Sequence, residues 1–123
     1  MAKKIERSTL IMAAGNKPKK IDEFIGRVNS GTDEVSIARM KSPAGWSEPG
    51  QAPAFNEYSL VLKGMLRVTT KKRTYDIHAG EAFIASAGEW VRYSTPDQGG
   101  AEYIAVCCPG FSPELVNRDD DMA

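Results

Sequence analysis

Short runs of β-forming residues, each ended by Gly, Pro, Asn or Asp, recur about every ten residues along most of the chain. The runs are rich in Val, Ile, Tyr, Phe and Thr, which favour strands. Closing such strands into a barrel or a two-sheet jelly roll shortens or removes their exposed edges. We therefore predict an all-β fold with little helix, built from the strands Ser8 to Met12, Val35 to Met40, Glu57 to Leu62, Met65 to Thr70, Arg73 to Ile77, Ala82 to Ala85, Val91 to Ser94 and Glu102 to Cys108.

One stretch fits a helix as well as it fits a strand. Residues 19–25 follow Pro18, carry apolar side chains at helix-like spacing and end at Gly26. We expect a helix there. The alternative is an extended segment that wraps the barrel.

The chain has 123 residues, which suits one domain with one hydrophobic core. We expect an N-terminal strand and arm packing on the barrel over 1–34, the barrel itself over 35–112 and a C-terminal tail over 113–123. The charged end of that tail has little to bury, so we expect it to fray.

The middle of the chain carries a glycine, a glutamate and a second glycine at a spacing that points to a fold. Gly45 comes first, and Glu57 and Gly64 are separated by the strand-forming segment 58–63. This pattern resembles the first cupin motif, in which a glycine precedes two histidines one residue apart, then a glutamate, six residues and a glycine. Gly64 is expected to turn the chain back into the next strand.

A second stretch, residues 80–93, resembles the second cupin motif. Gly80, Glu81 and Gly88 match it, whereas Ser86 stands where proline is usual and Val91 where histidine is usual. The resemblance covers roughly residues 40–110. It implies a single cupin double-stranded β-helix, or jelly-roll barrel, with its site at the open mouth.

The metal centre that the cupin resemblance implies, three histidines and a glutamate around a divalent ion, lacks its histidines here. Counting back from Glu57 places the expected pair at Gln51 and Pro53, or one residue earlier at Gly50 and Ala52. We therefore expect no cofactor and no metal.

Two residues bear on this expectation. The only histidine, His78, lies at the turn entering the second motif and should face outward. An alternative keeps a weakly held hard metal on oxygen atoms of Glu57, Glu48 and Gln51.

Side chains alternate across a strand, so residues that share the parity of Glu57 should line the barrel interior. Buried carboxyl groups that repel one another become usable acids or bases, so Glu57 and Tyr93 are the expected catalytic residues. The structural alternative makes Glu57 a hydrogen-bonded residue at the entrance and Tyr93 a core residue. The expected ligand-binding residues are Trp46, Glu48, Gln51, Phe55, Glu89, Trp90 and Tyr103.

The charge balance and the hydropathy of the chain limit the classes of partner and the location that we expect. Sixteen basic residues balance sixteen acidic ones, so we expect neither nucleic acid nor an anionic membrane surface as a partner. The start is too polar for a signal peptide, and a membrane span needs about 20 apolar residues, so a cytoplasmic location is expected. Cys107 and Cys108 are adjacent, so we expect reduced thiols, one facing in and one facing out.

These observations leave the function open between three hypotheses. The first is a cupin that binds a small polar metabolite in the barrel mouth and acts as a metal-independent isomerase, lyase or cyclase. The second is a non-catalytic ligand-sensing or interaction module, and the third is the cupin with a weak oxygen-ligated metal. A homodimer is expected in each case, because the apolar segment Leu10–Met12 could add to a partner's sheet.

Overall fold

Antiparallel pairing joins nine strands into one curled sheet in the computed structural model, which describes residues 2–120. The strands pair in the order β1-β2-β3-β9-β5-β8-β4, and β6 and β7 also pair with β5. Their bounds are β1 (Thr9–Ile11), β2 (Lys20–Ile25), β3 (Ser36–Ser42), β4 (Trp46–Ser47), β5 (Asn56–Thr70), β6 (Thr74–His78), β7 (Ala82–Ala85), β8 (Val91–Thr95) and β9 (Ala101–Cys108). The all-β prediction is confirmed.

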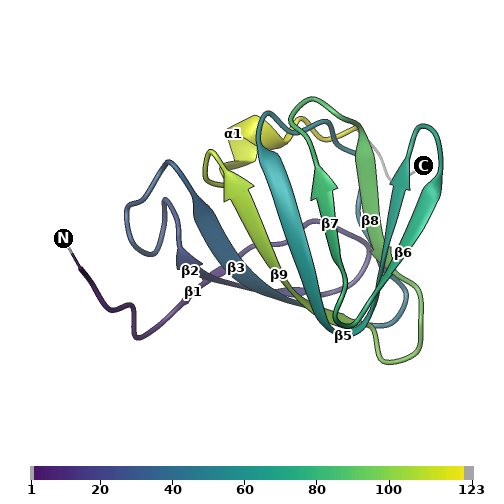
Figure 1. Ribbon diagram of the computed structural model, residues 1–123, viewed down its shortest axis with the longest axis horizontal. Helices are drawn as coiled ribbons and strands as arrows, with labels where there is room; N and C mark the ends of the chain where they lie inside the picture. The colour runs from purple at the N-terminus through teal and green to yellow at the C-terminus, as the bar shows by residue number, and fades with distance from the viewer. Residues whose placement is uncertain (1, 121–123) are drawn as a thin grey trace.

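The sheet curls into a half-barrel. Figure 1 shows it bending from β2 and β3 through β9 and β5 to β8 and β6, with α1 (Pro113–Val116) over one end. This four-residue segment is the one helix of the described chain. Within residues 2–120, no helix has the length and hydropathy needed to cross a membrane.

The long strand β5 corrects the prediction of two strands with a turn at Gly64. Its first half pairs with β7 and β9, and its second half pairs with β6 and β8. Gly64 lies opposite Ala101 with φ 76°, and a Cβ atom there would collide with the carbonyl oxygen of Gly100. The glycine therefore allows a bend at a close backbone approach, and the chain does not reverse.

The helix expected over residues 19–25 is also wrong, because residues 20–25 form strand β2, in agreement with the alternative of an extended segment. Its backbone groups pair with β1 on one side and β3 on the other, as in the pair Ile21 and Met40. Apolar residues at this spacing fit both structures, and the presence of two partner strands decides for the strand.

The C-terminal segment is more ordered than predicted. Arg118 forms a β-bridge with Gln51, and the Asp119 amide donates a 2.8 Å hydrogen bond to the carbonyl oxygen of Gly50. Residues 121–123, also predicted to fray, lie outside the described residues.

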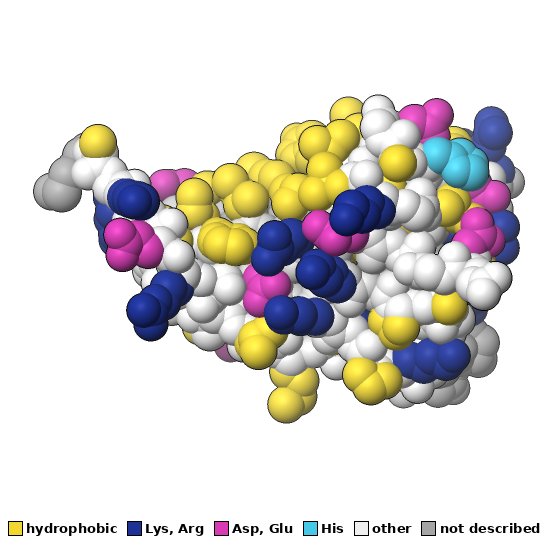
Figure 2. All heavy atoms as spheres, turned by 90° about the horizontal axis from the view of Figure 1, so that it is seen from below, with side chains coloured by type: hydrophobic (Ala, Val, Ile, Leu, Met, Phe, Trp, Pro, Cys, Tyr) yellow, Lys and Arg dark blue, Asp and Glu magenta, His cyan; other side chains and the backbone are white. Residues whose placement is uncertain are grey.

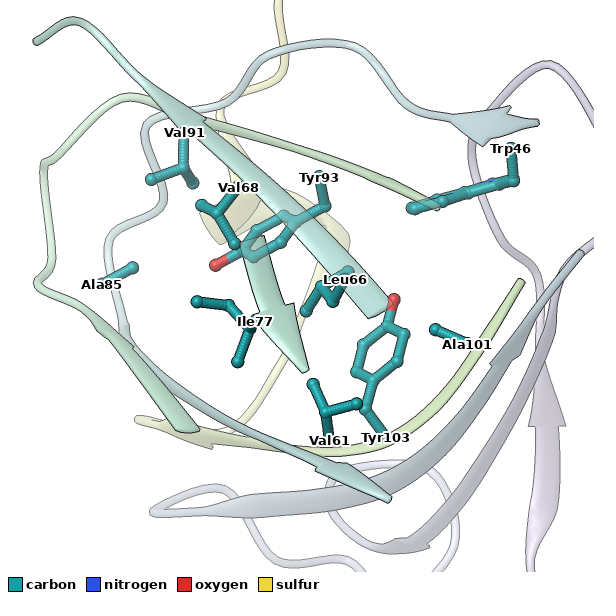
Figure 3. Packing of buried hydrophobic residues seen from close by; sticks show 10 residues of the cluster. All are labelled: Trp46, Val61, Leu66, Val68, Ile77, Ala85, Val91, Tyr93, Ala101 and Tyr103. Atoms are coloured by element: carbon teal, nitrogen blue, oxygen red, sulfur yellow. The ribbon is translucent and has the colours of Figure 1, made fainter. Parts of the chain in front are cut away.

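Buried side chains from both halves of the curl form the core. Figure 3 shows them converging from different strands, and Val91 among them is fully buried at the position where the cupin motif has histidine. Burying one Val or Leu side chain stabilises the fold by roughly 1.5–3 kcal/mol. The main cluster comprises Trp46, Val61, Leu66, Val68, Ile77, Ala85, Val91, Tyr93, Ala101 and Tyr103.

Candidate functional site

A cavity of about 60 Å³ lies inside the curl of the sheet, and we call it the barrel cavity. One buried water needs roughly 10–15 Å³, so the barrel cavity has room for several waters or one small molecule. Strands β2, β3, β5, β8 and β9 all contribute side chains to its wall. Further lining side chains come from β1, the arm between β1 and β2, the segment between β4 and β5, and the segments before and after α1.

The barrel cavity brings together most of the residues predicted for the site. Those that line it are Glu48, Gln51, Phe55, Glu57, Tyr93 and Tyr103. Trp46 is buried beside it. Glu89 is exposed and Trp90 is half-buried, and neither lines the cavity. Both follow the turn at residues 87–88, where strand alternation does not hold.

Two carboxyl groups, the buried Glu48 and the half-buried Glu57, face the cavity. The pKa of Glu57 is raised from 4.5 to about 7, mainly by desolvation and also by the charge of Glu48, while Lys19 and Tyr93 act to lower it. Burial also raises the pKa of Glu48, against the opposing charges of Lys19 and Arg118. The charge of Glu48 is one cause of the raised pKa of Glu57, so ionisation of one group favours the protonated form of the other.

Lys19 is held between two aromatic rings. Its Nζ atom donates a 2.7 Å hydrogen bond to the Tyr103 hydroxyl and lies 4.0 Å from the centre of the Trp46 ring. A cation above an indole face is an attractive arrangement. The sequence reasoning missed Lys19, because it placed this residue at the start of a helix outside the barrel.

Two polar atoms in the barrel cavity have no hydrogen-bond partner within residues 2–120. They are the Tyr93 hydroxyl and Gln51 Oε1, on side chains that are 3% and 5% exposed. Tyr93 lies close enough to Glu57 to lower its pKa, but the two groups do not meet the geometry of a hydrogen bond. A buried polar group without a partner costs roughly 1–3 kcal/mol, so these atoms indicate a place where waters or a ligand bind.

Apolar side chains also line the cavity. Ile21, Ala38, Met40, Ala105 and Phe111 line it from β2, β3, β9 and the segment before α1. Small-molecule sites commonly combine such a wall with a few polar groups that fix orientation.

The residues do not fit the metal centre that the cupin resemblance implies. No group of three His, Cys, Asp or Glu side chains within the described range is arranged to hold a metal ion. Val91 is packed in the core, and His78 is exposed on β6, where Figure 2 shows it on the molecular surface. Glu48, Glu57 and Gln51 do line one cavity, but they supply only two charged oxygen ligands.

One characterised protein is similar in sequence to this chain, and the similarity covers only part of that protein. The chain is 43% identical over 101 residues to the protein named Endoribonuclease YbeY of Myxococcus xanthus (strain DK1622). The match covers 82% of this chain, which spans only about a third, 34%, of that protein. No protein-family model matches the chain.

Several solved structures have a similar fold over most of this chain. The polyketide cyclase RemF from Streptomyces resistomycificus matches with a TM-score of 0.76 and 20% identity, over 100% of this chain and 88% of that one. A variant of Bacillus subtilis oxalate decarboxylase matches with a TM-score of 0.73 and 18% sequence identity, over 90% of this chain and 30% of that one. The EutQ protein of Clostridium difficile matches with a TM-score of 0.63 and 18% sequence identity, over 75% of this chain and 63% of that one. At these identities the likeness concerns the fold alone.

Proposed function

We propose that this chain, which has the cupin fold, binds a small molecule in the barrel cavity and transforms it by acid–base chemistry. The observation that carries the proposal is the pair of carboxyl groups in one cavity, the buried Glu48 and the half-buried Glu57, beside the Tyr93 hydroxyl, which has no hydrogen-bond partner among the described residues. An acid and a base held at different protonation states in one cavity are the equipment for moving protons on a substrate. An isomerase, a lyase or a cyclase needs no more than this.

The structural neighbours support a small substrate. RemF is named a polyketide cyclase and another neighbour an oxalate decarboxylase, so proteins with this fold include enzymes of small-molecule chemistry. The barrel cavity has a matching size, because about 60 Å³ holds a small molecule and no polymer.

The relative from Myxococcus xanthus is named an endoribonuclease, and this chain matches about a third of it. We infer that this chain serves a small molecule and does not bind RNA. The formal net charge of the chain is zero, whereas binding to phosphate backbones depends on an excess of cations. Incubation of the chain with labelled RNA checks this, and cleavage or a salt-sensitive shift in migration would contradict it.

The expected homodimer remains a proposal. Strand β1 forms the edge of the sheet, and Leu10 and Met12 are 65% and 92% exposed there. An exposed edge with apolar side chains favours pairing with a second copy. Light scattering gives the mass in solution, and a monomer at high concentration would refute the pairing.

Ligand-observed NMR with a small-metabolite library tests the proposed function. Wild type is compared with Ala105→Met, which fills the cavity from β9 because Ala105 is buried at its apolar wall. A compound bound by wild type and excluded by Ala105→Met supports the cavity as the site. Equal binding by both proteins places the site elsewhere and overturns the proposal.

Turnover of a bound compound then separates the enzyme from the sensing module. Loss of an acid or base lowers the rate by roughly 100-fold or more, which is the result we expect for Glu57→Gln. A compound that binds the cavity and is returned unchanged would instead support the non-catalytic alternative.

A further inference from the structure

We propose that the ligand of the barrel cavity is a small, mainly apolar carbonyl compound whose oxygen accepts hydrogen bonds from the Tyr93 hydroxyl and the Glu57 carboxyl group. This inference rests on the proposed function and names its substrate class. It depends on three features of the cavity: an unused donor, the sign of the charges around it and an apolar wall.

The unused donor is the hydroxyl of Tyr93. It projects from β8 into a cavity where it has no partner among the described residues, on a side chain that is 3% exposed. Figure 3 shows its ring in the interior of the curl, among side chains from several strands. Burial raises the pKa of Tyr93, so the group keeps its proton and can donate it to an acceptor on a ligand.

Glu57 supplies a second donor beside the first. Its carboxyl group faces the same cavity from β5 and holds a proton up to a pH of about 7. A protonated carboxyl group kept in an apolar site next to a tyrosine hydroxyl is a known arrangement for binding a carbonyl oxygen and the enolate formed from it.

The surrounding charges disfavour ionic ligands. A carboxylate would approach the carboxyl groups of Glu48 and Glu57, while the two cations of the wall, Lys19 and Arg118, already act on Glu48, and Lys19 is bonded to Tyr103. An amine would be attracted by Glu48 and Glu57, but an ammonium group has no lone pair to accept the hydrogen bond of Tyr93. A neutral oxygen acceptor satisfies Tyr93 without adding charge to the cavity.

The apolar wall selects the remainder of the ligand. Ala38, Met40 and Ala105 give the same cavity hydrocarbon surface. A carbonyl compound with a short alkyl body would bury that surface and gain roughly 25 cal/mol per Å².

This placement has a chemical consequence. Glu48, in its carboxylate form, would remove a proton from the carbon next to the carbonyl group; the C–H electron pair would form a C=C bond, and the π pair of the carbonyl group would move onto its oxygen. Tyr93 and Glu57 would stabilise the resulting enolate oxygen by hydrogen bonds. Return of a proton from Glu48 to the carbon restores the neutral compound, and in D₂O the returned nucleus is a deuteron.

Three probes of similar size and different charge test the class: butanone, propionate and butylamine. Protein-observed NMR at pH 6 should give butanone a dissociation constant at least tenfold below those of the two ionic probes. Tyr93→Phe removes one donor and should weaken butanone binding about tenfold, since tenfold corresponds to about 1.4 kcal/mol. Equal or tighter binding of either ionic probe, or unchanged binding by Tyr93→Phe, would overturn the inference.

The pH dependence provides a second readout. In wild type, butanone should bind more weakly at pH 8.5 than at pH 6, because Glu57 loses its donor proton. Glu57→Gln keeps an N–H donor at both pH values, so its binding should not change with pH. A wild-type affinity that does not change with pH would contradict the role of Glu57.

Proton exchange tests the chemistry, and a cavity control separates the two proposals. In D₂O the wild-type protein should exchange the α-protons of butanone, and Glu48→Gln should lose at least nine-tenths of this rate. If library compounds without a carbonyl group bind wild type and not Ala105→Met while butanone does not bind, the carbonyl class is wrong and the cavity site stands. If butanone binds wild type and Ala105→Met alike, the proposed function itself fails.

Discussion

The ammonium group of Lys19 donates a 2.7 Å hydrogen bond to the hydroxyl of Tyr103, a residue 84 positions later in the chain. The same arm is tied down a second time, because the indole nitrogen of Trp46 donates a 3.1 Å hydrogen bond to the carbonyl oxygen of Ala14. These contacts hold the segment between β1 and β2 against the barrel cavity, where Ala14 and Lys19 form part of the wall.

Replacing Lys19 by methionine should lower the free energy of unfolding by about 1–3 kcal/mol, because a hydrogen bond to a charged group is lost and Glu48 loses a neighbouring cation. The variant should also raise the pKa of Glu57, which the charge of Lys19 lowers. Urea unfolding and carbon NMR of the Glu57 carboxyl group measure the two effects. Lys17→Met is the control, since Lys17 is exposed and donates a hydrogen bond to the carbonyl oxygen of Ala44, away from the barrel cavity. An unchanged pKa in Lys19→Met would remove Lys19 from the electrostatics of the site.

The site residues that lie on strands could be predicted from the sequence. Side chains point alternately to the two faces of a strand, whichever strand it pairs with. Glu57 and Tyr93 lie on β5 and β8, and both point inward as their parity predicts. Glu89 shares the parity of Tyr93 but precedes the strand, and its side chain is exposed. Counting from Glu57 also placed Gln51 and Phe55 correctly, whereas counting from Tyr93 failed at Glu89, beyond the turn at residues 87–88.

The other half of the site comes from the ends of the chain, which local patterns could not place. Lys19 and Arg118 reach the barrel cavity only because β2 joins the sheet and the segment after α1 pairs with Gln51. Both events are long-range pairings, and the apolar spacing of residues 19–25 is equally compatible with a helix. The sequence predicts a special backbone conformation at Gly64, but glycine suits a bend within a strand as well as a chain-reversing turn, so the pattern could not distinguish the two.

Gly64→Ala should destabilise the protein by more than about 2 kcal/mol, because the residue has φ 76° and its added Cβ would meet the backbone oxygen of Gly100. Gly80→Ala separates the two causes. Gly80 also has a positive φ, 87°, but its Cβ would enter open space, so only the backbone cost of about 1 kcal/mol is expected. Thermal and urea unfolding of both variants measure the difference. Equal losses would mean that β5 shifts away from Gly100 without cost.

Cys107 should resist thiol reagents in the folded protein. It is 5% exposed in the cavity wall, and burial and the charge of Glu57 raise its pKa, against a hydrogen bond with Ser36. Since the thiolate is the reactive form, the Cys108→Ser protein should react with a disulfide reagent only after urea is added. The half-buried Cys108 in a Cys107→Ser protein provides the comparison. Rapid labelling of Cys107 without denaturant would show that the cavity opens to solvent more widely than its wall implies.

The stability of the protein should fall as the pH rises from about 4.5 to 7. Glu57 has a pKa of 4.5 in the unfolded chain and about 7 when folded, so the folded state binds the proton more tightly. Its contribution is complete below the unfolded pKa and is lost as the pH rises through the folded one. At about 1.4 kcal/mol for each pKa unit, the loss is about 3 kcal/mol. Glu57→Gln cannot ionise, so relative to wild type it should gain about that much between pH 5 and pH 8 in urea unfolding. Glu89→Gln, at an exposed carboxyl group, should show no such gain. If both variants follow wild type across this range, Glu57 is ionised in the folded protein at neutral pH and cannot serve as the acid of the site.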